Sequence, residues 1–216
     1  GCGALCPTGA ASYALPAPDA GMGRLRTLLS AYHGAGGVAP ALLVHDGAHG
    51  ADLIHALAHT GPGLPARVIP VQVNEITQLG LEWFVAAFAY GASAIRVLGR
   101  ARPRHDMTAL DRTLALTRTI LSGLGFSDDA VHLVATDDPE ALGSALSALP
   151  MGPLVTSRAS FLPVGGKRQV LRLALGEVHL RAPRPVAVIP LETGAPMGGL
   201  IHAADGCTLC LACVSA

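Results

Sequence analysis

Five cysteines are the residues of this chain best suited to chemistry. They lie only near the two ends of the 216-residue sequence, at Cys2, Cys6, Cys207, Cys210 and Cys213. An odd number of cysteines cannot all pair as disulfides within one chain. The C-x2-C-x2-C spacing of the last three is too tight for local disulfides of normal geometry. That spacing instead suits a compact loop that turns three thiolates towards one metal cluster, so the sequence predicts metal ligation by cysteine.

The two cysteine segments resemble complementary parts of the bacterial ferredoxin motif, C-x2-C-x2-C-x3-C-P. The C-terminal CTLCLACVSA supplies its first three cysteines, and the N-terminal GCGALCPTGA supplies C-x3-C-P. In two-cluster ferredoxins the fourth cysteine of each run ligates the other cluster. The resemblance implies that Cys2 serves a second cluster and that one [4Fe–4S] cluster is held by Cys6, Cys207, Cys210 and Cys213.

Partial motifs at both ends indicate a segment of a longer polypeptide, running from the middle of one motif to the middle of the next. We therefore expect the two ends to meet in the whole protein, with the intervening domain as a long insertion. Domain termini often lie close together, which makes this arrangement easy to build. A truncated ligand set would let the cluster be lost from this chain. Zinc is the alternative metal, although zinc sites more often use paired C-x2-C knuckles.

Composition excludes several classes of protein. Half of the residues are apolar and 14% are charged, with a mean hydropathy of +0.46, which argues against intrinsic disorder. Charged residues and prolines interrupt the apolar runs before the roughly 20 residues of a membrane-spanning helix, so we expect no membrane partner. Fifteen basic and 15 acidic residues leave no basic excess for binding nucleic acid. We expect a cytoplasmic protein, since thiolate clusters are usual in reducing compartments and no signal-peptide pattern is present.

Between the cysteine segments, apolar strand patterns alternate with helical patterns. This alternation predicts an α/β fold with a parallel sheet of about four to five strands and flanking helices. We expect strands at residues 41–45, 67–71, 93–98, 131–135 and 185–189. We expect helices at residues 23–32, 50–58, 77–90, 107–124, 138–149 and 166–180. Thr77 is the expected cap of the third helix, and Pro70 suits an edge strand or a bulge better than the centre of a sheet.

The patterns divide the chain into four parts. Residues 1–18 contain the end of a first ferredoxin motif and a linker, and residues 19–150 form the α/β domain. Residues 151–203 extend that domain with a helix and a strand, and residues 204–216 begin a second ferredoxin motif.

Residues 40–149 resemble the hydrogenase-associated iron–sulfur subunit of the delta type, which links hydrogenase or formate dehydrogenase to heterodisulfide reductase. The resemblance rests on the order of strands and helices, and above all on GLEWFVAAFAYGA at residues 80–92. That family places the cysteines of a [2Fe–2S] cluster at the ends of the early strands. Here those stretches read VQVNE and LGRAR, without cysteine. The resemblance implies an α/β fold and an electron-transfer setting with a redox partner, and no cluster ligand from the middle of the chain.

Polar residues follow three of the predicted strands. Asp46 follows the first, Asn74 and Glu75 follow the second, and a basic loop at residues 100–105 follows the third. Ligands of open parallel sheets bind beyond the carboxyl ends of the strands, which favours an anion, nucleotide or flavin pocket there. No G-x-G-x-x-G is present, so a solvated loop or docking surface is the other interpretation.

Histidines offer a weaker metal hypothesis. His55 and His59 share one face of a predicted helix, but no third ligand can be assigned, so surface histidines are the favoured interpretation. No catalytic residue can be assigned either. We therefore expect a non-catalytic electron-transfer component of a cytoplasmic redox complex, with the α/β domain as scaffold or docking module. The alternative is a module that binds a nucleotide, flavin or anion at the strand ends.

Overall fold

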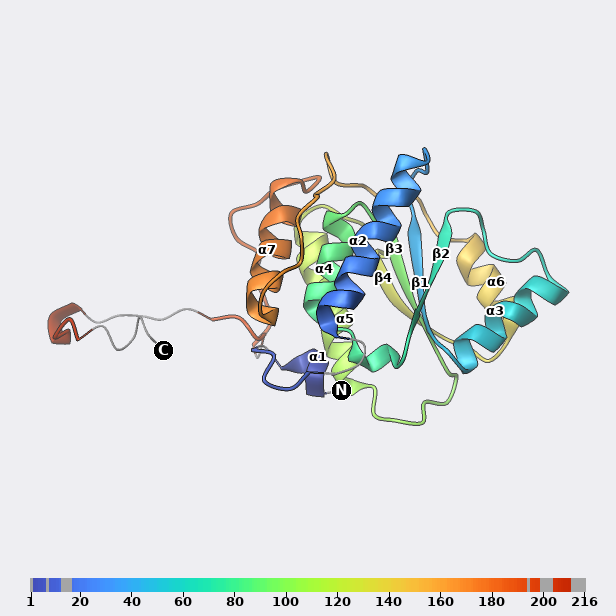
Figure 1. Cartoon of the computed structure of the whole chain (residues 1–216), viewed down its shortest axis with the longest axis horizontal. Coiled ribbons are helices and arrows are strands. Elements are labelled where there is room, and N and C mark those ends of the chain that lie inside the picture. Colours follow the sequence, from blue (N-terminus) through green and yellow to red (C-terminus); the bar gives the residue numbers. More distant parts are fainter. Residues whose placement is uncertain (1, 7, 13–16, 194, 199–203, 211–216) are drawn as a thin grey trace.

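The computed structural model describes residues 2–6, 8–12, 17–193, 195–198 and 204–210. Its four strands form one parallel sheet in the order β2-β1-β3-β4 (Figure 1). The strands are β1 (Ala41–Asp46), β2 (Val68–Val73), β3 (Ala94–Gly99) and β4 (Val131–Ala135). The predicted α/β fold with a parallel sheet is confirmed.

Helices cover both faces of this sheet (Figure 1). One face carries the pair α3 (His49–Thr60) and α6 (Pro139–Ser147). The other carries α2 (Pro18–Gly34), α4 (Leu81–Ala89) and α5 (Thr108–Gly123). A further helix, α7 (Lys167–Leu180), packs against α4 on the side away from the sheet.

Three single-turn elements complete the described structure: α1 (Cys2–Leu5), η1 (Ile76–Gln78) and η2 (Ala204–Gly206). Helix α1 contacts α5 and η1, so the N-terminal cysteine segment lies against the domain. In Figure 1, η2 stands apart from the domain.

Helix α4 is the centre of the larger hydrophobic core. Every residue of its sequence LEWFVAAFA except Glu82 is buried, and Phe84 and Phe88 are completely so. A helix that is apolar on all sides is stable only where neighbours surround it. The sheet, α2, α5 and α7 provide those neighbours, and a smaller, separate core lies beneath α3 and α6.

Two predicted elements differ from the structure. Thr77 does not cap a helix: it lies in η1, where its backbone N–H donates to the Glu75 carboxylate (3.4 Å), and α4 begins only after Gly80. Residues 185–189 form no strand. Prolines at 185 and 190 lack the N–H that a sheet ladder needs. The segment instead runs past the end of α5, where Arg184 N donates to Leu124 O (2.9 Å).

Proline positions account for two other features. Helix α2 begins at Pro18, five residues earlier than the predicted Gly23, with this proline in its first turn. The ring fixes a helical φ, and the missing N–H would be unpaired there anyway, so Pro18 starts the helix and is not part of a linker. The expectation for Pro70 is confirmed: it lies in β2, which has β1 as its only neighbour in the sheet order.

Gly50 sets the distance between α3 and the sheet. A Cβ built on it would lie 2.5 Å from His45 Cβ and 3.3 Å from His45 Cα, in the buried strand β1. We expect Gly50→Ala to lower the free energy of unfolding by about 1–3 kcal/mol through overpacking, although alanine favours helices. Urea unfolding measures this. Gly23→Ala in α2, where a Cβ meets nothing within 4 Å, should instead stabilise by about 0.5–1 kcal/mol, and equal effects at both sites would contradict the packing argument.

Candidate functional site

The N-terminal cysteine turn, residues 2–6 and 8–12, places hydrogen-bond donors around the sulfur atom of Cys6. Cys6 Sγ lies 3.5 Å from Thr8 Oγ1. The Thr8 hydroxyl, followed by the backbone amides of Ala11 and Thr8, lowers the pKa of the Cys6 thiol from 9.0 to about 6. The thiolate, which is the form that binds metals, therefore predominates at neutral pH.

This environment predicts the pH dependence of alkylation. A lowered pKa means that the reactive thiolate appears as pH rises through about 6, so iodoacetamide labelling of metal-free Cys6 should level off above that pH. Thr8→Val removes the strongest donor and should move the inflection to higher pH. Peptide mapping by mass spectrometry measures each rate. Thr60→Val, on α3, is the control, and an inflection near 9 in the unmodified chain would contradict the prediction.

The C-terminal cysteine turn, residues 207–210, also directs a hydrogen-bond donor at a cysteine sulfur. The backbone N–H of Leu209 donates to Cys207 Sγ (3.4 Å), and Leu209 has a φ of 53°. This left-handed conformation is uncommon for a residue with a branched side chain, and here it accompanies the sulfur-directed hydrogen bond. Cys207 and Cys210 are both exposed, and Cys213 lies outside the described residues. Hydrogen bonds to sulfur are among the features that tune iron–sulfur clusters, so both turns fit a thiolate ligand.

Of the cysteines that the structure describes, those near the N-terminus and those near the C-terminus do not lie together. Cys2 and Cys6 belong to the segment at the domain surface, whereas the segment with Cys207 and Cys210 follows η2, which stands apart (Figure 1). Within the described ranges, no three Cys, His, Asp or Glu side chains lie close enough to hold a metal ion. The meeting of the two ends, and ligation by all five cysteines, stay predictions. His55 and His59 are exposed on α3.

Lys167 holds the N-terminal turn to the domain. Its Nζ donates to the carbonyl oxygens of Gly3 and Ala4, both at 2.6 Å, and lies 3.7 Å from Glu82 Oε1. It is the only lysine of the chain and the first residue of α7. One ammonium group therefore joins α1, α4 and α7. This role of Lys167 was not predicted from the sequence, because nothing near Lys167 along the chain indicates its partners.

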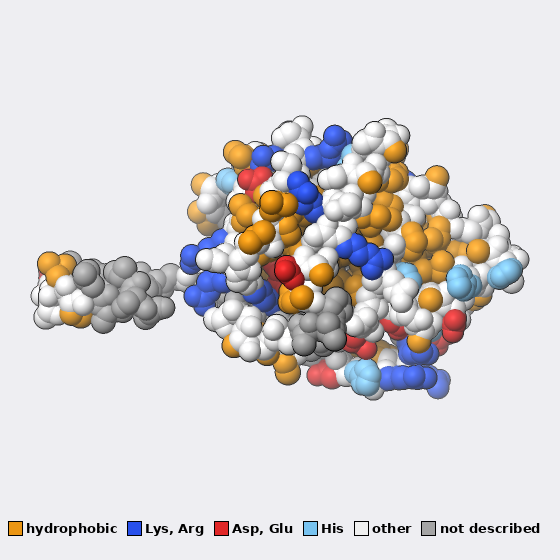
Figure 2. All heavy atoms as spheres, viewed as in Figure 1, with side chains coloured by type: hydrophobic (Ala, Val, Ile, Leu, Met, Phe, Trp, Pro, Cys, Tyr) orange, Lys and Arg blue, Asp and Glu red, His pale blue; other side chains and the backbone are white. Residues whose placement is uncertain are grey.

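Glu82 is the acidic member of this contact. Its side chain is only 17% exposed, and burial raises the pKa of its carboxyl group, while the attraction of Lys167 opposes that increase. A hollow of about 780 Å³ lies beside the pair, bounded by α2, α7 and the N-terminal turn. Figure 2 shows hydrophobic side chains gathered on this face between α2 and α7.

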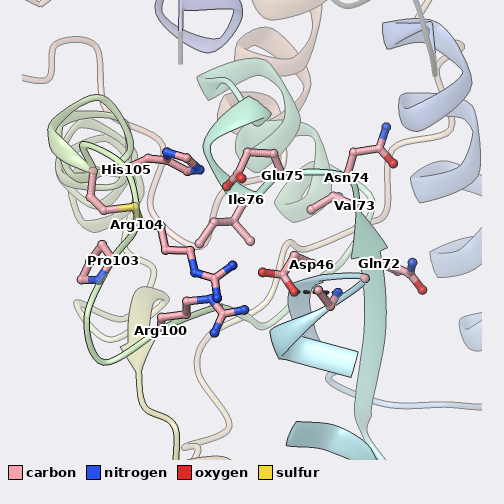
Figure 3. A pocket seen from close by; sticks show the side chains of 13 residues that line it. Asp46, Gln72, Val73, Asn74, Glu75, Ile76, Arg100, Pro103, Arg104 and His105 are labelled. Atoms are coloured by element: carbon pink, nitrogen blue, oxygen red, sulfur yellow. Dashed lines mark hydrogen bonds between the residues drawn. The ribbon is translucent and has the colours of Figure 1, made fainter. Parts of the chain in front are cut away.

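A second site lies at the carboxyl ends of β1, β2 and β3, where a pocket of about 400 Å³ opens (Figure 3). The structure brings together there the polar residues that the sequence analysis selected. They are Asp46, Asn74, Glu75, Arg100, Arg104 and His105. Arg102, on the same loop, is not among the lining residues.

The positively and negatively charged side chains of this pocket lie on opposite walls. Arg100 and Arg104 extend from the loop after β3 towards Asp46 (Figure 3), and among the described residues neither guanidinium forms a hydrogen bond or ion pair. Asp46 Oδ1 accepts hydrogen bonds from the backbone N–H groups of Ala48 (3.0 Å) and Gly50 (2.9 Å) at the start of α3. The two arginines are therefore the free cationic groups of this site, facing carboxylates on the opposite wall.

No protein-family model matches this chain, and no curated protein matches it. Among the described residues, no helix has the length and apolar character needed to cross a bilayer.

Proposed function

We propose that this chain is an electron-transfer part of an iron–sulfur protein. Cys6, Cys207, Cys210 and Cys213 hold one [4Fe–4S] cluster, and Cys2 serves a second one. The observation that carries this proposal is the complementary spacing of the two cysteine segments. Hydrogen bonds directed at the sulfur atoms of Cys6 and Cys207 support it, since such bonds stabilise thiolate ligands.

The protein residues have defined tasks in this proposal. A bound cluster supplies one-electron redox chemistry. Cys6 provides a thiolate, Thr8 donates to its sulfur, and Lys167 fixes the turn that carries both to α4 and α7. The α/β domain is then a scaffold that docks a redox partner. Its setting is a cytoplasmic complex of the hydrogenase, formate dehydrogenase or heterodisulfide-reductase kind, as the resemblance to the delta-type subunit implies.

Anaerobic reconstitution with iron and sulfide tests this proposal. The chain should bind roughly four irons and four sulfides, and after reduction it should give an EPR signal of a [4Fe–4S] centre. Cys6→Ser and Cys210→Ser each remove a thiolate of the same cluster and should abolish most of the bound iron. Cys2→Ser is the matched control, because it lies in the same turn as Cys6 but serves the other cluster, and it should retain the signal.

One outcome would contradict the identity of the metal centre, and another would contradict the assignment of Cys2 and Cys6 to different clusters. Tight binding of zinc, with no iron retained under anaerobic conditions, would replace the cluster with a zinc site. A Cys2→Ser variant that loses as much iron as Cys6→Ser would contradict the assignment of these two cysteines to different clusters.

A further inference from the structure

We propose that the pocket at the strand ends binds a phosphomonoester that carries vicinal hydroxyl groups, the chemistry shared by sugar phosphates and nucleoside monophosphates. The proposal is independent of the cysteines, because no cysteine lines this pocket.

The position and size of the pocket are the first argument. In the sheet order β2-β1-β3-β4, the chain leaves β1 towards β2 on one side and returns to β3 on the other. This reversal is where open parallel sheets bind ligands, beyond the carboxyl ends of the strands. The loops after β1, β2 and β3 all line the cavity. Its volume of about 400 Å³ lies in the lower part of the range of small-molecule sites, which suits a nucleoside monophosphate or a smaller compound.

Arg100 and Arg104 mark the part of the pocket that would bind the phosphate group. Both line the cavity and point into it from the same loop (Figure 3). Guanidinium groups bind phosphate oxygens through paired, charge-assisted hydrogen bonds. Because neither group has a hydrogen bond or ion pair among the described residues, a phosphate here would displace no such interaction within that part of the chain. His105, on the same side, adds a third potential donor.

The N-terminus of α3 is not the place in the pocket where the phosphate would bind. The Asp46 carboxylate already accepts hydrogen bonds from the amides of Ala48 and Gly50 in the first turn of that helix. This built-in anion would repel a second one at the same place. The phosphate therefore belongs on the side of the loop after β3.

Glu75 and Asp46 mark the part of the pocket that would bind the vicinal hydroxyl groups. Glu75 follows β2 by two residues, faces the pocket, and uses one oxygen to accept from Thr77 N (3.4 Å). In dinucleotide-binding folds, an acidic residue at the end of the second strand accepts hydrogen bonds from the ribose hydroxyls. With cations on one wall and carboxylates on the other, the pocket can orient a ligand that has a phosphate at one end and a diol at the other.

Calorimetric titration of the metal-free chain tests the phosphate end, with AMP, ribose 5-phosphate and inorganic phosphate as probes at fixed ionic strength. At least one phosphomonoester should bind more tightly than inorganic phosphate. AMP alone would indicate a nucleotide, and ribose 5-phosphate alone a sugar phosphate. Arg100→Gln and Arg104→Gln should each weaken binding about tenfold or more, the effect of losing a charge-assisted hydrogen bond. Arg102→Gln, on the same loop but outside the lining, should leave affinity unchanged.

A paired comparison tests the hydroxyl end with the tighter-binding phosphomonoester and its 2-deoxy analogue. The unmodified chain should prefer the diol, and Glu75→Gln should reduce that preference while leaving the thermal unfolding temperature unchanged. The proposal is overturned if no phosphomonoester binds at millimolar concentration, if all three probes bind equally, or if Arg102→Gln weakens binding as much as Arg104→Gln.

Discussion

Replacing Phe88 with alanine should lower the free energy of unfolding by about 3–5 kcal/mol, the range for a large aromatic side chain removed from a closed core. Phe88 is completely buried, and its ring packs edge to face against Phe126 with the ring centres 5.4 Å apart. It belongs to α4, which has the sheet on one side and α7 on the other, so no neighbour can move freely into the space left behind.

Urea unfolding followed by circular dichroism measures this effect. Phe88→Leu retains most of the apolar volume and should cost less than half as much. Leu180→Ala, at the end of α7, is the surface control: its side chain is 69% exposed, and the change should stay within about 0.5 kcal/mol. A loss below about 1 kcal/mol for Phe88→Ala would mean that α4 is not packed on both sides.

The second large effect is expected from Lys167→Met, which leaves Glu82 as a buried carboxylate without its cation. Breaking such a pair by removing one partner costs about 3 kcal/mol or more at neutral pH. The change also removes the donor that binds the carbonyl groups of Gly3 and Ala4. We therefore expect the N-terminal cysteine turn to loosen, which faster limited proteolysis near residues 2–6 would detect.

The pH dependence of this variant identifies the cause. Burial raises the pKa of Glu82 above its ordinary 4.5, so the folded state holds this proton more tightly than the unfolded state does. The contribution of Glu82 to stability consequently falls as pH rises from about 4.5 through the folded pKa, and stays constant above it. Without Lys167 the folded pKa rises further. The stability lost in Lys167→Met should therefore be smallest near pH 4 and largest at neutral pH.

A double variant separates charge from packing. Glu82→Gln combined with Lys167→Met removes the lone carboxylate and should recover much of the lost stability at neutral pH. Lys167→Arg keeps the positive charge and should be nearly neutral. If the double variant were no more stable than Lys167→Met alone, the lost free energy of unfolding would come from the other contacts of the lysine side chain and not from an unpaired Glu82 carboxylate.

Most of the fold could be predicted from local patterns. The strand at residues 131–135 is an apolar run bounded by turn residues, and its predicted and observed limits agree. The expected helix at 77–90 failed at its start, because Glu75 caps the separate short helix η1 and the backbone is extended at Leu79 and Gly80 before α4 begins. The expected strand at 185–189 failed because an apolar run with flanking prolines looks the same whether it joins a sheet or packs over a helix.

The candidate sites were predictable to different degrees. The carboxyl ends of parallel strands meet at one edge, so Asp46, Glu75 and Arg104 could be placed together from their positions after three strands. The contact of Lys167 with Gly3 could not, since it joins residues from opposite parts of the sequence and depends on how α7 packs on α4. Side-chain periodicity shows which face of a helix is apolar, but not which helix that face will meet.

The position of α4 between the sheet and α7 also governs how the molecule opens. The amide protons of α4 can exchange with solvent only after two separate packing surfaces have come apart, so they should report the free energy of global unfolding. The α3–α6 pair covers a smaller core of its own on the opposite face. We expect that layer to open while α4 remains closed, so the amide protons of α3 and α6 should exchange faster than those of α4, beside the N-terminal turn.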